Sequence, residues 1–488
     1  MNFARDVVDA TPGDRLALVE LARDGSRREW SFGEVAKRSA RLAGTLVERG
    51  VRPGDTVMTL IGNRPDWVSA MVACFRIGAV VLPCTEQLRA RDLALRLEVA
   101  RPKVVLADER NNAELEAARG GWDGFLVLST PDESLYAGDP PPAVDLAPDA
   151  PCLITFTSGT AGEPKAVLHA QRYLAGQRVQ AEHWLGAREG ELVWCTAASG
   201  WSKSARNVFI APWLLGAASL LHDERFDPHQ RLEILARERV DVLCMAPTEY
   251  RVIAKRARLR PVEGLRSLVA AGEALNPEVL RAWEEATGLR IRDGYGQTET
   301  GQLTGNLVGD QARPGSMGRP LPGVSLWVAD GELVGDPATF PTFFLGYLHE
   351  EVAEEVGEAA PTGLWRTGDR VHEDQDGFLF FEGRNDDVII SSGYRIGPFE
   401  VESALVAHDA VAEAAVVAAP DEERGAVVRA VVVLREGHER SDALARELQA
   451  HVRAHTAPYK YPRIVDFADD LPKTASGKVR RAALRGEG

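Results

Sequence analysis

The residues most suited to chemistry run from Ile154 to His169, in the stretch ITFTSGTAGEPKAVLH. An apolar start typical of a buried strand is followed by hydroxyls, glycines and a lysine, namely Thr157, Ser158, Gly159, Thr160, Ala161, Gly162, Glu163, Pro164 and Lys165. Glycines let backbone N–H groups wrap around an anion, hydroxyls add donors, and the lysine adds charge. The pattern predicts a polyphosphate-binding loop, although it lacks the Gly-Lys-Ser/Thr ending of the common nucleotide loop. The alternative is a flexible surface loop.

Three further predicted strands also end in small or polar residues. Residues 192–196 lead to Gly200 and Trp201, residues 267–271 lead to Gly272 and Glu273, and Arg290 to Arg292 leads to DGYGQTETG. Ligands bind at the carboxyl ends of strands in open α/β sheets. These loops are therefore expected to share one site with the polyphosphate loop.

Strands and helices alternate along the chain in a way that places these loops. Strands are predicted at residues 16–19, 57–60, 80–82 and 104–107, and Ser31 is predicted to cap a helix ended by Gly50. Such alternation implies a parallel or mixed sheet covered by helices, an α/β fold. A proline-rich linker at residues 131–151 precedes the polyphosphate loop.

The predicted secondary structure changes near Gly331, where short strands and turns replace the alternation of strands and helices. Arg384, Asn385, Asp386 and Asp387 separate two apolar strands, and about 100 residues beyond them are predicted to form a small α+β unit. We therefore expect three segments, which are a large N-terminal domain at 1–383, a hinge at 384–387 and a small C-terminal domain at 388–488.

Composition limits the function classes. The 488 residues carry a net charge of −15, which argues against a nucleic-acid partner. The five cysteines are scattered without a C-x-x-C pair, so reduced thiols in a cytoplasmic protein are expected rather than a zinc site. Neither a signal peptide nor a membrane span is predicted. The sequence leaves the oligomeric state open, a homodimer included.

Four motifs in order, TFTSGTAGEPK, DGYGQTETG, WRTGDR and LPKTASGKVRR, resemble the adenylate-forming superfamily of acyl-CoA synthetases, adenylation domains and luciferases. The segments SGWSKSARNVFIAPW, GRNDDVIISSGYRIGPFEVE and TAPYKYPR are most similar to medium-chain acyl-CoA synthetases. The resemblance implies a large ATP- and acyl-binding domain with a small mobile domain. It also implies ATP, Mg²⁺ and coenzyme A as cofactors and a small carboxylic acid as substrate. The acid would become acyl-AMP with release of pyrophosphate, and CoA would then displace AMP.

The resemblance also assigns roles at the ATP site. The loop from Thr157 to Lys165 would hold the β- and γ-phosphates, Thr298 the α-phosphate and Glu299 the Mg²⁺. Asp369 and Arg384 would hold the ribose, and Lys478 would bridge the carboxylate and the α-phosphate. The other implied ATP-site residues are Gly272, Glu273, Asp293, Gly294, Tyr295 (stacking on adenine), Gly296, Gln297 and Arg395.

Coenzyme A would bind when the small domain rotates about Asp386. The implied CoA surface consists of Gln87, Ser392, Gly393, Tyr394, Arg424, Arg453, Tyr461, Pro462 and Arg463. Arginines there suit nucleotide phosphates, although arginines equally often line a solvated helix face.

The acyl pocket is implied at Trp201 and Gly296. Acetate-specific relatives carry a tryptophan where this chain has Gly296, so the resemblance implies a tunnel for a longer acid. Arg206 stands where relatives carry an apolar or aromatic residue; we expect it to face solvent, the alternative being contact with a polar substrate group.

Two other functions stay open. An adenylating ligase could load an acyl carrier protein, an amino acid, or a branched or aryl acid; Gly200 and Trp201 stand where amino-acid activators keep an aspartate. A non-catalytic nucleotide binder is the third class. Taken singly, each site residue has an ordinary structural explanation, such as a surface ion pair for Asp369 and Arg384. Their combination in this order favours an enzyme.

Overall fold

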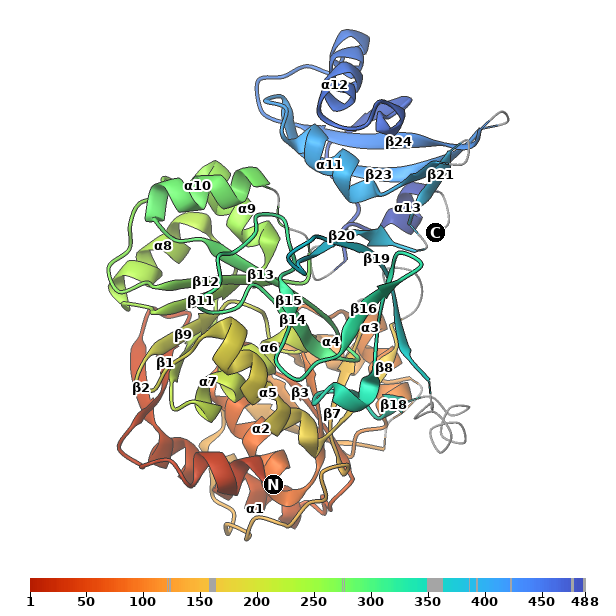
Figure 1. The fold of residues 1–488 in the computed structure, drawn as a ribbon. Helices are drawn as coiled ribbons and strands as arrows, with labels where there is room; N and C mark the ends of the chain where they lie inside the picture. Colours follow the sequence, from red (N-terminus) through yellow and green to blue (C-terminus); the bar gives the residue numbers. More distant parts are fainter. Residues whose placement is uncertain are drawn as a thin grey trace.

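The computed structural model describes residues 1–120, 122, 124–157, 164–273, 275, 277–348, 363–385, 387–391, 394–421, 424–474 and 478–485. Sheets covered by helices form a large N-terminal part, and a smaller C-terminal unit stands at one end of it (Figure 1). The expected α/β class is confirmed. Within the described residues, no helix is long and apolar enough to cross a membrane.

Two large sheets build the N-terminal part. The nine-stranded sheet has the order β15-β14-β13-β12-β11-β9-β10-β1-β2, with mostly parallel pairing between β13 and β1. Its strands are β1 (Leu16–Leu21), β2 (Arg27–Ser31), β9 (Leu192–Cys195), β10 (Ala218–His222), β11 (Val242–Met245), β12 (Ser267–Ala271), β13 (Ile291–Gln297), β14 (Gly301–Gly305) and β15 (Arg319–Pro320).

The seven-stranded sheet has the order β18-β8-β7-β4-β3-β5-β6. Its strands are β3 (Thr56–Leu60), β4 (Val80–Cys84), β5 (Val104–Asp108), β6 (Leu126–Thr130), β7 (Pro151–Phe156), β8 (Ala166–Ala170) and β18 (Gly346–Tyr347). The predicted polyphosphate loop joins β7 to β8, which pair antiparallel.

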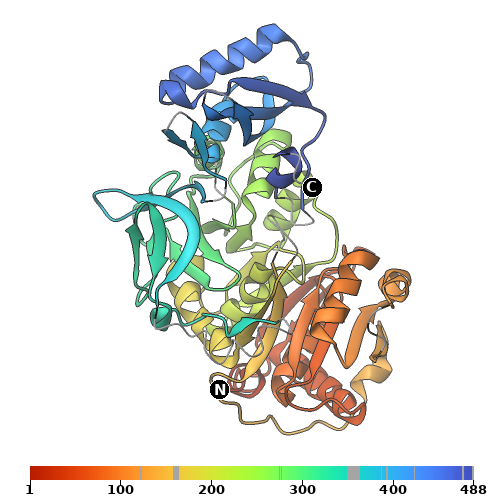
Figure 2. The same cartoon turned by 90° about the vertical axis from the view of Figure 1, so that its right-hand side faces the viewer.

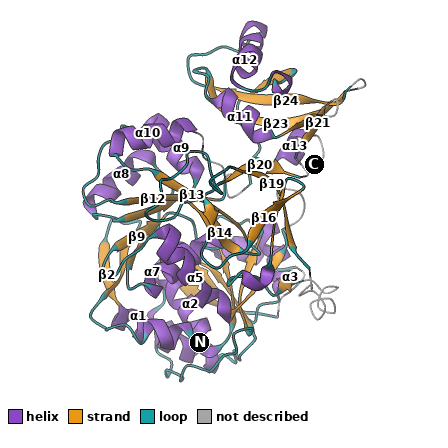
Figure 3. Ribbon diagram, in the orientation of Figure 1, coloured by secondary structure: helices purple, strands orange, loops and turns teal. Residues whose placement is uncertain are grey.

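Helices cover these sheets and their ends follow from local capping (Figure 3). The main ones are α1 (Phe32–Glu48), α2 (Pro65–Ile77), α3 (Ala90–Ala100), α5 (Gln171–Gln180), α8 (Pro228–Arg237), α9 (Pro247–Arg256) and α10 (Pro277–Thr287). Ser31 and Glu34 form a capping box at α1, as the sequence predicts for Ser31. Helix α8 begins directly after Asp227, whose side chain accepts from the backbone N–H groups of His229 and Gln230.

The core between the two sheets is aromatic. Trp67 of α2 meets Phe209 edge-on at 5.7 Å between ring centroids, and Phe209 lies 5.1 Å from Trp213. All three rings are buried. Phe209 belongs to η5 (Arg206–Ile210), which follows the short α6 (Ser202–Ala205). The segment after Trp201 therefore runs through the middle of the large domain.

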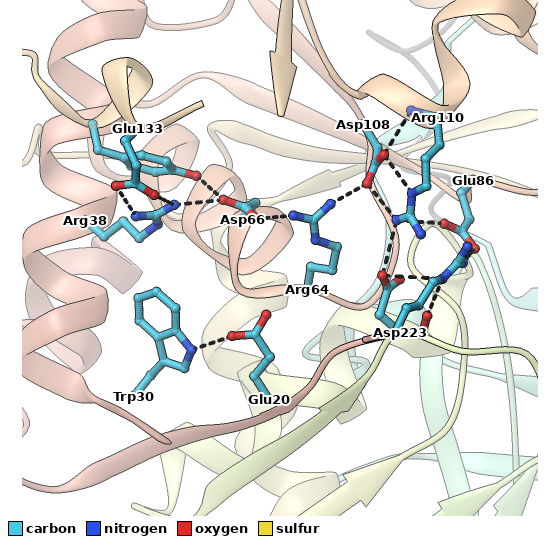
Figure 4. A network of polar contacts seen from close by, with 12 residues as sticks. Glu20, Trp30, Arg38, Arg64, Asp66, Glu86, Asp108, Arg110, Glu133 and Asp223 are labelled. Atoms are coloured by element: carbon cyan, nitrogen blue, oxygen red, sulfur yellow. Dashed lines mark hydrogen bonds and ion pairs between the residues drawn. The ribbon is translucent and has the colours of Figure 1, made fainter. Parts of the chain in front are cut away.

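An ion network also ties the two large sheets together (Figure 4). Arg110 binds Asp108 at the end of β5 (2.6 Å) and Asp223 just after β10 (3.2 Å). Arg64 reaches both Asp108 and Asp66. Because Asp108 and Asp223 follow strands of different sheets, Arg110 fixes one sheet against the other at their carboxyl edges.

The rest of the chain forms smaller sheets (Figure 2). A four-stranded sheet contains β16 (Leu326–Ala329), β17 (Glu332–Gly335), β19 (Trp365–Glu373) and β20 (Leu379–Arg384). The C-terminal unit contains β21 (Ile389–Ser391), β22 (Tyr394–Ile396), α11 (Pro398–Val406), β23 (Val411–Asp421), β24 (Gly425–Leu434), α12 (Asp442–His455), β25 (Ile464–Ala468) and α13 (Arg481–Arg485). The expected hinge residue Asp386 lies outside the described residues.

Candidate active site

The polyphosphate loop is closed at its base by a hydrogen-bonded pair. The N–H of Thr157 donates to the carbonyl of Lys165, and the N–H of Lys165 donates to Oγ1 of Thr157, both at 2.9 Å. The loop residues Ser158, Gly159, Thr160, Ala161, Gly162 and Glu163 lie outside the described residues. Strand pairing of β7 with β8 thus fixes where the loop begins and ends.

Tyr347 joins the loop to the expected magnesium ligand, and the sequence analysis did not identify it. The ammonium of Lys165 lies 4.9 Å from the centre of the Tyr347 ring, and the Tyr347 hydroxyl donates to Oε1 of Glu299 at 2.8 Å. Burial raises the pKa of Tyr347, with the Glu299 charge adding to the effect, so this hydroxyl remains a donor. No sequence signal marked Tyr347, because its two-residue strand β18 is too short to form a pattern.

The expected ribose site centres on Asp369, which is 5% exposed. Its Oδ2 accepts from the Tyr295 hydroxyl at 2.5 Å and from Nε2 of Gln297 at 3.0 Å. Arg384 stands directly opposite Asp369 in the β19–β20 ladder. Burial raises the pKa of Asp369, while the Tyr295 hydrogen bond and Arg384 oppose that rise. The structure thus brings Tyr295, Gln297, Asp369 and Arg384 together.

The expected adenine residues directly follow β12 or lie within the adjacent strand β13. Glu273 accepts from the hydroxyl of Thr248 at 2.7 Å. Asp293 is buried and burial raises its pKa well above the usual range. Gly294 admits no side chain, because a Cβ there would come within 2.7 Å of Nε1 of Trp184.

Lys203 lies at the same strand end and was also missed. Its ammonium donates to the carbonyl of Ala271 at 2.7 Å, and a Cβ on Gly272 would approach it to 2.9 Å. Gly272 also has a φ of +103°, which favours glycine. The stretch SGWSKSARN suggested Trp201 rather than Lys203 as the functional residue, because lysines are usually solvated.

Lys478 reaches this site from the C-terminal unit. Burial lowers the pKa of Lys478, and repulsion from Lys203 lowers it further, whereas Glu273 and Asp369 raise it. Such effects require the Lys478 ammonium to lie near all three groups. The backbone around it is held by a 2.7 Å hydrogen bond from the N–H of Thr474 to the carbonyl of Lys478.

The expected CoA residues are only partly assembled. Arg453 and Arg463 both lie about 5 Å from the ring of Tyr461, at 5.0 and 5.1 Å. Tyr394 stacks on Tyr459 at 4.3 Å. Arg424 donates its backbone N–H to Asp421, Pro462 is buried, and Gln87 is exposed on the large domain; Ser392, Gly393 and the Arg395 side chain lie outside the described residues.

The acyl pocket differs from the expectation at Gly296. A Cβ on Gly296 would lie 1.8 Å from the carbonyl oxygen of Gly301 in the paired strand β14. The missing side chain thus allows close strand pairing, and the interpretation of Gly296 as an open tunnel wall needs correction. Trp201 is half-buried and lines a small cavity with Gly200, Phe156 and Leu88.

Arg206 also differs from the expectation. We expected it to face solvent, but it is 4% exposed. It begins η5, directly after α6, and this segment passes through the core rather than along the surface. The apolar residues that follow Arg206 in the sequence indicate a buried segment, and Val208, Phe209 and Ile210 are indeed buried.

Comparison with known proteins identifies the family. A model of AMP-binding enzymes matches residues 4–339, and a model of the AMP-binding enzyme C-terminal domain matches residues 400–478. The chain belongs to the AMP-binding enzymes. It is 39% identical to the uncharacterized acyl-CoA ligase YtcI of Bacillus subtilis (strain 168), over 97% of this chain and 93% of that protein.

Other relatives of this AMP-binding enzyme agree. Mouse mitochondrial acyl-coenzyme A synthetase ACSM3 is 37% identical, over 99% of this chain and 90% of ACSM3. A solved benzoate CoA ligase from Burkholderia xenovorans LB400 superposes with a TM-score of 0.88 at 27% identity, covering 99% of this chain and all (100%) of that chain. The chain is thus an AMP-forming acid–thiol ligase that uses ATP, Mg²⁺ and CoA, and the expected superfamily is confirmed.

Proposed function

We propose that this enzyme activates a carboxylic acid larger than acetate, of medium chain length, as acyl-AMP and then transfers the acyl group to CoA. The proposal of residue roles is supported mainly by the charge interactions of Lys478, since Lys203, Glu273 and Asp369 of the large domain all act on the pKa of this lysine from the C-terminal unit. A carboxylate and a phosphate repel each other, so their reaction needs preorganised positive charge. Lys203 and Lys478 supply that charge from two sides.

The nucleotide would lie between the polyphosphate loop and β19. Lys165 would bind the β- and γ-phosphates, Thr298 the α-phosphate, and Asp369 with Arg384 the ribose. Glu299 would hold Mg²⁺, which usually takes one or two carboxylates together with substrate phosphates. When bound, Mg²⁺ neutralises phosphate charge. The described residues contain no cluster of three metal-ligating side chains, which agrees with a metal held partly by the substrate.

The second half-reaction would need a different arrangement of the domains. We propose that residues 384–387 are the hinge, with Asp386 at its centre, and that rotation there withdraws Lys478. Arg453, Tyr461 and Arg463 would then face the large domain and bind CoA. Their mutual contacts support one recognition surface, since arginine pairs well with phosphates and an aromatic ring with adenine.

Trp201 is half-buried beside a small cavity, a position that suits contact between its ring and the carbon chain of an acid larger than acetate. The reduced state of the five buried cysteines supports a cytoplasmic location.

The experiment is a product assay with the purified chain. Acetate, butanoate, hexanoate, octanoate and benzoate are each supplied with ATP, Mg²⁺ and CoA, and AMP, pyrophosphate and thioester are quantified. AMP and pyrophosphate in equal amounts with a medium-chain thioester are expected. ADP with orthophosphate would contradict adenylation, and transfer to a carrier protein but not to CoA would favour the carrier-loading alternative.

A further inference from the structure

A buried arginine with an incomplete set of hydrogen bonds lies in the core of the large domain. Arg206 is 4% exposed, and among the residues that the structure describes its Nε and Nη1 have no hydrogen-bonding partner. A guanidinium is always charged, and burying such a charge without an acidic partner is costly. A cost of this kind is usually retained for a ligand.

The side chains around Arg206 are polar, and they too include buried atoms that lack hydrogen-bonding partners among the described residues. The ring of His169 in β8 is fully buried, and the one hydrogen-bonding group within its reach in the described part of the chain is the backbone of Thr298. Its ring lies 4.2 Å from the ring of Tyr173 of α5, tilted by 36°, and the Tyr173 hydroxyl is within hydrogen-bonding reach of Arg206. Next to Arg206, Asn207 accepts from Nε2 of Gln180 at 2.9 Å, while its own Nδ2 lacks a described partner.

These five residues, Arg206, Asn207, His169, Tyr173 and Gln180, are called the Arg206 cluster below. None of them is acidic. Burial and the Arg206 charge lower the pKa of His169 to about 3, so the imidazole is neutral at ordinary pH. The cluster therefore carries one positive charge and several free donors, and a ligand that completes it must bring negative charge and acceptor oxygens.

The cluster lies beside the catalytic groups. His169 is in β8, the strand that leaves the polyphosphate loop after Lys165, and the backbone of Thr298 lies against its ring. Arg206 follows Lys203 by three positions across α6 and η5, and helical residues three apart have Cβ atoms about 5–6 Å apart. Lys203 and Arg206 therefore leave this segment on the same side, a placement that suits a substrate in contact with both side chains.

We propose that the Arg206 cluster binds the far end of the acid and that this end carries a second carboxylate, so that the enzyme activates dicarboxylic acids. This inference rests on the proposed adenylating function and narrows its substrate class. A guanidinium binds a carboxylate through two parallel hydrogen bonds, and Tyr173 and Asn207 are placed to add donors. Sites with unpaired polar groups discriminate strongly, by about 10⁴–10⁵-fold, against analogues that leave those groups unpaired.

The test compares acids of equal carbon number. Acid-dependent ATP–pyrophosphate exchange is measured with butanoate and succinate, pentanoate and glutarate, and hexanoate and adipate. Wild type is expected to favour at least one diacid over its monoacid by 100-fold or more in kcat/KM. Arg206→Leu should lose the diacid activity by at least 100-fold and retain or improve the monoacid activity. If none of these acids supports exchange, the adenylating function itself is refuted.

A matched control separates recognition from folding. Arg231 is also buried, at 5% exposed, but it has partners, with Nη1 3.1 Å from Nδ1 of His222 and Nη2 3.4 Å from Glu249. Arg231→Leu should lower the melting temperature and leave the ratio of diacid to monoacid activity unchanged. Arg206→Leu should lower the melting temperature less than Arg231→Leu does, because it removes a buried charge that has no acidic partner among the described residues.

Binding is also measured without turnover. The preferred diacid should raise the melting temperature of wild type and not that of Arg206→Leu, whereas chloride at equal ionic strength should raise neither. The proposal is overturned if wild type prefers monoacids throughout, if Arg206→Leu keeps the wild-type profile, or if chloride stabilises as well as the diacid does.

Discussion

Lys203 of the large domain lowers the pKa of Lys478 of the C-terminal unit through charge repulsion, in addition to the larger effect of burial. Two ammonium groups from distant parts of the chain thus face one site. Their mutual repulsion is unfavourable until anions bind between them. Glu273 and Asp369 offset it only in part, so the arrangement favours an anionic reaction centre at this position.

Lys478→Ala should abolish most of the first half-reaction. Loss of one preorganised charge typically costs about 10²–10³ in rate. Acyl-AMP formation, measured by pyrophosphate exchange, should fall by this factor, whereas thioester formation from supplied acyl-AMP should change little. Lys473→Ala is the control, because Lys473 lies in the same motif but binds Glu413 at 2.9 Å and Asp470 at 3.1 Å. Equal loss in both half-reactions would contradict the proposed domain rotation.

Lys203→Met should change the pH dependence of adenylation. Lys478 acts as a cation, and its pKa lies below the usual lysine value, so the exchange rate should fall on the alkaline side earlier than an unperturbed lysine would allow. Removing the Lys203 charge removes repulsion and raises the pKa of Lys478, which should move that alkaline decline to higher pH. Lys203→Arg keeps the charge and should leave the decline in place. An unmoved decline in Lys203→Met would show that the two lysines do not interact.

Tyr347→Phe should weaken Mg²⁺ binding. The Tyr347 hydroxyl orients Glu299 through a 2.8 Å hydrogen bond, and loss of a partner that orients a metal ligand costs about 10–100-fold in affinity. The Mg²⁺ concentration for half-maximal exchange should rise by about 10-fold or more. The phenylalanine ring keeps the contact with the Lys165 ammonium, so the KM for ATP at saturating Mg²⁺ should be unchanged. A raised KM for ATP with unchanged Mg²⁺ dependence would assign Tyr347 to the phosphates instead.

Asp66→Asn should destabilise the large domain. Asp66 is buried and binds Arg38 at 3.0 Å, Arg64 at 3.1 Å and the Tyr136 hydroxyl at 2.6 Å (Figure 4). Breaking a buried ion pair costs about 3–5 kcal/mol, less here because each arginine keeps a second carboxylate.

Urea denaturation with Asp145→Asn as control measures this effect. Asp145 pairs with Arg5 but its side chain is 92% exposed, and such surface pairs contribute less than about 1 kcal/mol. Similar losses in both variants would mean that the network does not brace the two sheets.

Much of this architecture could be predicted from the sequence, for identifiable reasons. Ser31 could be predicted as a helix cap because a helical apolar pattern follows it, and the structure adds Glu34 as its capping-box partner. The strands β3, β5 and β12 could be predicted from short apolar runs. The motifs around Lys165, Glu299, Asp369 and Lys478 carry polar residues at strand ends, where a structural role alone would not favour them. These residues are the ones that the structure brings near one another or near shared partners.

Other site residues were not predictable because their roles arise only from tertiary contacts. Tyr347 belongs to a strand of two residues, and nothing local links it to Glu299. Arg206 was expected at the surface because arginine usually lies there; its burial results from the packing of η5 against β9, β10 and α5. Similarly, the absence of a side chain at Gly296 suggested free space, whereas a neighbouring strand fills that space.

Gly296 therefore supports a final prediction that separates two explanations of its small size. A tunnel explanation predicts that Gly296→Trp shortens the acyl pocket and shifts preference toward acetate while the protein stays intact. The structure instead predicts strain, because even a Cβ would lie 1.8 Å from the Gly301 oxygen and 2.9 Å from Cα of Gln302. Forcing extra atoms into a filled space typically costs about 1–3 kcal/mol, and more where backbone must move.

The measurement is melting temperature together with exchange rates for acetate through octanoate. Gly296→Ala, and more strongly Gly296→Trp, should melt at lower temperature and lose exchange with every acid in the same proportion, because β13 also carries Tyr295 and Gln297 toward Asp369. Gly120→Ala is the control, since nothing lies within 4 Å of a Cβ there. If Gly296→Trp melts normally and selects acetate, its side chain enters a tunnel, and the pairing of β13 with β14 yields more readily than this structure indicates.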